Sequence, residues 1–82
     1  KPEKYVMVAI EHGEISIGGK AGPAAFVDIR NIGYLSGDTT QKISGRICSR
    51  LRELLAIPGD RVYLNFTDIS PYNWGWNGKT FG

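Results

Sequence analysis

Arg61-Val62-Tyr63-Leu64-Asn65-Phe66-Thr67-Asp68 alternates between apolar and polar side chains, and this alternation decides the fold class. A period of two is typical of a β-strand with one face on the core and the other face open. The valine, leucine and phenylalanine share one face, while Tyr63 and Asn65 lie together on the other. A phenol and a carboxamide two residues apart on an open face form a hydrogen-bonding platform.

The residues before this strand predict a helix between two strands. Ser36 is placed to cap a helix whose apolar residues recur on one stripe. We expect the helix to end at residues 56–59, because Pro58 cannot continue the hydrogen-bond ladder and Gly59 accepts the turn. Ala24–Asn31 is predicted as the first strand of this β-α-β unit. The apolar stripe consists of Ile43, Ile47, Leu51, Leu54 and Leu55.

The two ends of the chain add further predicted strands. Tyr5–Glu11 is a continuous apolar run that predicts an extra, largely buried strand. Residues 74–81 read Trp-Gly-Trp-Asn-Gly-Lys-Thr-Phe, an aromatic hairpin with a tight turn at Asn77-Gly78. The sequence therefore predicts one α/β domain over residues 1–82, with a β-α-β unit, an extra strand and a C-terminal hairpin. Its polar platform and aromatic side chains are typical of a small-ligand pocket.

Composition excludes several classes of function. A net charge of +2 over 82 residues is too small to predict nucleic-acid binding. One cysteine excludes an internal disulfide, and one histidine, His12, makes a metal site improbable. The sequence contains no run of about 18 apolar residues, which a membrane-spanning helix would need. Lys42, Arg46 and Arg50 form a basic stripe, for which a solvated helix face is a sufficient explanation and an acidic partner the sharper alternative.

Four stretches, in the same order, resemble the macrophage migration inhibitory factor and D-dopachrome tautomerase family of the tautomerase superfamily. They are Lys1–Tyr5, Asn31-Ile32-Gly33, Pro58–Tyr63 and Gly75–Phe81, so the resemblance covers the whole chain. It implies a tautomerase-like sandwich of β-α-β units. Family members begin with a strand and helix of about 30 residues that this sequence does not contain. We therefore expect an N-terminally incomplete domain.

The resemblance also implies roles for individual residues. Lys1 would pair with a substrate carboxylate and stabilise the developing enolate, and Ile32 would offer its backbone N–H to the carboxylate. Tyr63 and Asn65 would hydrogen-bond the substrate in a pocket between subunits. An aromatic rim would consist of Trp74, Trp76 and Phe81. From the residues alone, Tyr63 and Asn65 are explained by an exposed sheet face, and Lys1 by a solvated terminal charge. A strand-to-loop turn explains Ile32 as well as a binding role does. The aromatic side chains can equally fill the core or a subunit interface.

The implied activity is cofactor-independent keto–enol tautomerisation of aromatic α-keto acids such as phenylpyruvate. This reaction needs a base and donors that stabilise an enolate oxygen. In the family the base is a mature N-terminal proline, and Pro2 does not occupy that position, so we expect the 82-residue chain alone to have little activity. The resemblance further implies a homotrimer. The alternatives are a cytokine-like protein that engages a receptor without turnover, or an inactive fragment. We expect a cytoplasmic protein, with release by a non-classical route.

Overall fold

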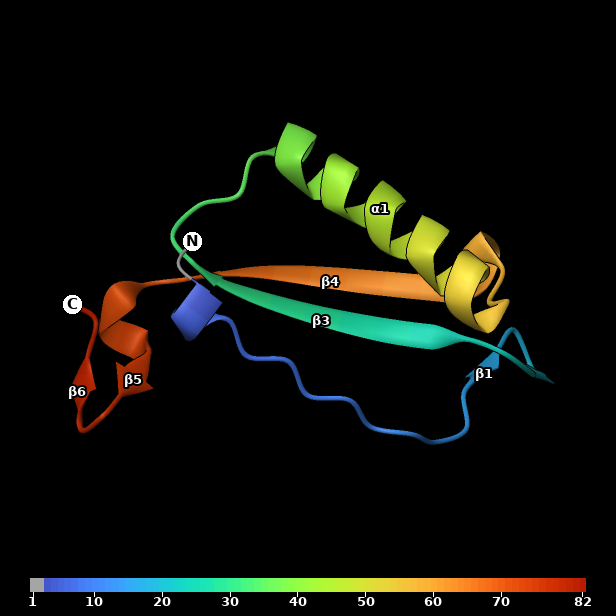
Figure 1. The fold of residues 1–82 in the computed structure, drawn as a ribbon, viewed down its shortest axis with the longest axis horizontal. Helices are drawn as coiled ribbons and strands as arrows, with labels where there is room; N and C mark the ends of the chain where they lie inside the picture. Colours follow the sequence, from blue (N-terminus) through green and yellow to red (C-terminus); the bar gives the residue numbers. More distant parts are fainter. Residues whose placement is uncertain (1–2) are drawn as a thin grey trace.

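The computed structural model describes residues 3–82, and its centre is a parallel β-α-β unit. Strand β3 (Ala25–Ile32) leads into helix α1 (Gly37–Leu55), which returns the chain to strand β4 (Val62–Ile69). The two strands pair in parallel over their whole length, and α1 lies across one face of the pair (Figure 1). The predicted unit is confirmed, with both strands displaced by one residue from the expected bounds.

Local sequence explains where α1 begins and ends. Its first turn is capped by Ser36, whose hydroxyl accepts a hydrogen bond from the Thr39 backbone N–H at 3.2 Å. The left-handed residue that ends the helix is Ala56 (φ 55°), not Gly59 as expected. An alanine in this region costs about 1 kcal/mol. Its N–H donates to the Arg52 carbonyl at 3.0 Å, and Gly59 instead opens the short 3₁₀ turn η2 (Gly59–Arg61).

The core between α1 and the strands is thin. Burial alternates along β4, so that Val62, Leu64 and Phe66 are half-buried while Tyr63 and Asn65 are exposed. This confirms the predicted alternation.

The predicted apolar stripe of α1 is only partly buried. Ile43, Ile47 and Leu51 are half-buried, whereas Leu54 and Leu55 are each 63% exposed. The prediction of one apolar stripe is therefore wrong for the last two residues. The turn at Ala56 folds the chain back directly after these two leucines. Ile57 becomes buried in their place, with 7% of its surface exposed.

A two-residue hairpin closes the C-terminal region as predicted. Strands β5 (Gly75–Trp76) and β6 (Lys79–Thr80) pair antiparallel. Asn77 and Gly78 join them with φ of 52° and 82°, and positive values at both central residues are what a type I′ turn requires.

A second hairpin lies before β3 and was not predicted from the sequence. Strands β1 (Ser16–Ile17) and β2 (Lys20–Ala21) pair antiparallel. Two consecutive glycines, at positions 18 and 19, supply the positive φ values of the turn. A Gly-Gly pair between short strands is itself a hairpin signal.

The extra strand expected over Tyr5–Glu11 is not formed. Residues 3–5 make a 3₁₀ turn, η1 (Glu3–Tyr5), and residues 6–15 have no regular structure. A strand is stable only when its backbone groups pair with a neighbour, and no strand among residues 3–82 pairs with this segment. Its apolar side chains consequently stay open to solvent, with Val6, Met7, Val8 and Ile10 between 59% and 84% exposed.

Candidate functional site

The predicted polar platform lies on the open face of the β3–β4 pair. Tyr63 is 60% exposed, and the Thr67 hydroxyl donates a hydrogen bond of 3.4 Å to the carboxamide oxygen of Asn65. That bond orients the amide so that its N–H groups face away from Thr67, where a ligand oxygen can accept from them. We call Tyr63 and Asn65 the β4 platform.

Arg61 fixes the chain next to this platform. Its Nε donates to the Pro23 carbonyl at 2.8 Å, and its Nη2 donates to the Lys20 carbonyl at 3.0 Å. The guanidinium therefore ties β2 and the loop after it to the start of β4, two residues before Tyr63. The sequence carries no signal for these bonds, because the partners are separated by 38 and 41 residues.

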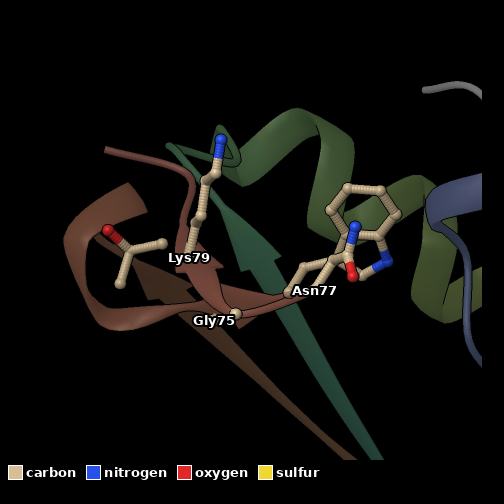
Figure 2. A pocket seen from close by; sticks show the side chains of 6 residues that line it. Gly75, Asn77 and Lys79 are labelled. Carbon is tan, nitrogen blue, oxygen red and sulfur yellow. The ribbon is translucent and has the colours of Figure 1, made fainter.

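The aromatic rim is built by the C-terminal hairpin. The 3₁₀ turn η3 (Pro71–Asn73) leads to Trp74, whose carbonyl accepts a hydrogen bond from Phe81 N–H at 3.1 Å. The Trp76 and Phe81 rings stack at 6.2 Å with an angle of 19° between their planes. A shallow hollow of about 510 Å³ lies in the hairpin, lined by residues 75–80 alone (Figure 2).

Tyr5 completes this rim, although it was not among the rim residues predicted from the sequence. Its ring meets Trp76 at 5.9 Å and Phe81 at 5.7 Å, edge-on in both contacts. The Lys4 ammonium lies 5.1 Å from the centre of the Tyr5 ring. Edge-to-face contacts are a favoured geometry for aromatic pairs. We call Tyr5, Trp76 and Phe81 the aromatic corner.

Ile32 lies at the same end of the molecule as the aromatic corner. It is the last residue of β3 and pairs in register with Ile69, the last residue of β4. Gly33 follows with φ of 104° and donates its N–H to the Ile69 carbonyl at 3.1 Å, which confirms the unusual backbone expected there. Figure 1 shows η1 and the C-terminal hairpin beside this end of the two strands.

The platform and the corner are therefore separate. In the parallel register Tyr63 lies beside Phe26, and Ile32 lies six residues further along β3. At about 3.3 Å per residue, this places Tyr63 about 20 Å from Ile32 along the strand. Asn65, beside Asp28, is about 13 Å from Ile32 by the same spacing. One copy of the chain does not bring the two halves into one pocket. Lys1, the predicted carboxylate partner, lies outside the described residues.

Two other kinds of site were searched for in residues 3–82. No helix there is long and apolar enough to cross a membrane. The same residues contain no group of three or more His, Cys, Asp or Glu side chains arranged for a metal ion.

Comparison with known proteins identifies the family. The sequence profile described as "Macrophage migration inhibitory factor (MIF)" matches residues 1–82. The chain belongs to the macrophage migration inhibitory factor family. A macrophage migration inhibitory factor homolog from Trichuris trichiura is 39% identical over 82 residues, covering 99% of this chain and 72% of the relative. The corresponding protein of Xenopus tropicalis is 37% identical, again over 99% of this chain and 71% of its own length.

Solved structures of the family agree with the fold. The macrophage migration inhibitory factor homologue from Prochlorococcus marinus superposes with a TM-score of 0.93 at 41% identity, over 100% of this chain and 73% of that one. The α/β tautomerase-like fold predicted from the sequence is thereby confirmed. Membership of this family within the tautomerase superfamily supports a tautomerase or a cytokine-like role.

Proposed function

We propose that the protein is a cofactor-independent keto–enol tautomerase of small aromatic α-keto acids, such as phenylpyruvate, whose site is completed by a second copy of the chain. The observation that carries this proposal is the split of the predicted site residues. Tyr63 lies near the start of β4 and Asn65 near its middle, whereas the aromatic corner lies beside the far end of the same two strands. The two halves offer complementary chemistry.

The two halves suit different parts of an aromatic keto acid. The hydroxyl of Tyr63 and the amide of Asn65 are donors for an oxygen that gains negative charge as the enolate forms. The flat rings of Trp76 and Phe81 are suited to stack on an aromatic ring. At the corner end, the resemblance implies that the Ile32 backbone N–H and the Lys1 ammonium would hold the carboxylate.

Proton transfer needs a further group. In the family this is an N-terminal proline, and in the present sequence Pro2 follows Lys1, so its nitrogen lies within an amide. We infer that residues 1–82 taken alone hold a substrate without moving its proton efficiently. A turnover number for this polypeptide close to that of complete relatives would overturn the inference.

Assembly of copies brings the halves together. When each copy offers its platform to the corner of the next, the contact is heterologous, and such contacts form a ring when the rotation between copies closes. The resemblance implies a ring of three. The unpaired apolar segment of residues 6–10 would give such an assembly additional surface to bury.

The function is tested by following enol–keto conversion of phenylpyruvate by absorbance with the full natural protein. Tyr63→Phe and Asn65→Ala should each lower kcat/KM by about tenfold to a hundredfold, because each removes a donor to the enolate oxygen. Tyr72→Phe is the matched control, since Tyr72 is 74% exposed and belongs to neither half. Equal effects of Tyr63→Phe and Tyr72→Phe would refute the assignment of the platform.

A binding role without turnover is the second candidate, and family membership favours it. It is distinguished by the same two platform variants. If they lose tautomerase activity but bind a cell-surface receptor as tightly as the unmodified protein, signalling does not depend on catalysis.

A further inference from the structure

An exposed ion pair lies on the open face of the sheet, between the two halves of the site. Arg30 donates from Nε at 3.3 Å and from Nη2 at 3.2 Å to Asp28, and the two side chains are 65% and 41% exposed. Both bonds end on one carboxylate oxygen, Oδ2. The guanidinium therefore does not form the parallel pair of bonds to two oxygens that makes arginine–carboxylate contacts strong.

The pair is weak and can exchange partners. Ion pairs exposed to this degree contribute little to stability, because water screens the charges and two long side chains must be ordered. A ligand carboxylate that offers two oxygens to the guanidinium fork is a better partner than Asp28 in its present geometry.

The position of Arg30 brings this exchange next to the site. Arg30 and Ile32 are two residues apart on β3, so their side chains leave the strand on the same side. Arg30 also lies beside Thr67, the residue that orients the Asn65 amide. Six exposed side chains lie on the open face of the two strands, and Arg30 is the one cation among these six described residues. They are Phe26, Asp28, Arg30, Tyr63, Asn65 and Thr67.

We propose that Arg30 is a specificity-determining residue that selects ligands carrying a carboxylate, and that Asp28 competes with the ligand for it. When such a ligand binds near Ile32, the guanidinium leaves Asp28 and pairs with the ligand carboxylate. This inference rests on the proposed function only for the location of the ligand, since the exchange needs no chemical step.

The proposal predicts effects of opposite sign for the two members of one ion pair. Arg30→Gln should weaken binding of an aromatic carboxylate by about fivefold to tenfold, the range for a solvent-screened arginine contact. Asp28→Asn should tighten it by about twofold to fivefold, because the competitor is removed. Binding of the matching neutral amide should not change in either variant. If the pair were merely structural, both substitutions would act in the same direction and on both ligands.

The experiment titrates 3-phenylpropionate and 3-phenylpropanamide into the full natural protein and follows indole fluorescence. Arg30→Lys should keep part of the preference for the carboxylate. Arg46→Gln is the control, because Arg46 is an exposed arginine that belongs to α1 and not to the two strands that form this face. Thermal unfolding of each variant shows that the fold is kept. With phenylpyruvate as substrate, Arg30→Gln should raise KM while kcat stays within about twofold.

The experiment distinguishes a failure of the role proposed for Arg30 from a failure of the proposed tautomerase function. Turnover of phenylpyruvate with a KM that Arg30→Gln leaves unchanged would overturn the role of Arg30 and leave the tautomerase intact. A carboxylate preference that depends on Arg30, without turnover, would support the role of Arg30 and overturn the proposed activity. Equal affinity of the unmodified protein for acid and amide would overturn the inference directly.

Discussion

Replacing Tyr5 with alanine removes the ring that joins the start of the described chain to the C-terminal hairpin. The Tyr5 ring makes edge-on contacts with Trp76 and Phe81, and Tyr5 is 44% exposed. Each aromatic pair contributes about 0.5–1.5 kcal/mol beyond its buried area. About half of a 200 Å² side chain is covered, which at about 25 cal/mol per Å² adds about 2.5 kcal/mol as an upper bound. Because these contributions overlap, we expect a loss of about 2–3 kcal/mol.

This loss should be local, because both ring contacts of Tyr5 are with the C-terminal hairpin region. Amide hydrogen exchange reports it at Phe81, whose N–H bonds to the Trp74 carbonyl. An opening free energy lower by about 2–3 kcal/mol corresponds to exchange that is about 30-fold to 150-fold faster. Tyr5→Phe keeps both ring contacts and should leave the exchange rate unchanged. If Tyr5→Ala changes that rate by less than about twofold, the aromatic corner does not hold the hairpin in place.

Three further substitutions test the packing that supports the site, each by denaturant unfolding. Ser36→Ala removes the cap of α1 and should lower the free energy of unfolding by about 1 kcal/mol, whereas Ser49→Ala, in the helix interior, should leave it nearly unchanged. Ile57→Ala should cost about 2–3 kcal/mol because the side chain is buried, and a cost below about 0.5 kcal/mol would contradict its place in the core. Arg61→Gln should lower the free energy of unfolding by about 1–2 kcal/mol, because it removes two hydrogen bonds to backbone carbonyls. Arg61→Lys should restore less than half of that loss, because an ammonium group lacks the planar fork of the guanidinium. Equal stability of the glutamine variant would show that the two bonds do not hold the loop.

The β3–α1–β4 unit was predicted to within about one residue because its signals are local. The alternation around Tyr63, the capping Ser36 and the Asn77-Gly78 turn each act over a few neighbouring residues. The Gly18-Gly19 turn is a local signal of the same kind, but the hairpin that it forms was not predicted.

The errors concern features that depend on distant partners. Tyr5–Glu11 has the composition of a strand, but a strand forms only beside another one, and residues 3–82 provide none for it. The contact of Tyr5 with Trp76 spans most of the chain, so no local pattern predicts it. The sequence also does not show how Tyr63 lies relative to the aromatic rim, because their separation along the strands follows only from the parallel register.

The most direct test of the split site is complementation between two impaired variants of the full natural protein. Asn65→Ala damages the platform, and Trp76→Ala damages the corner. If each site takes its platform from one copy and its corner from the next, random mixing after unfolding and refolding in equal amounts leaves about a quarter of the sites intact. We therefore expect the mixture to recover about a quarter of the tautomerase activity of the unmodified protein, while each variant alone keeps at most about a tenth of it. A mixture no more active than the variants alone would show that platform and corner act within one copy, and would contradict the account.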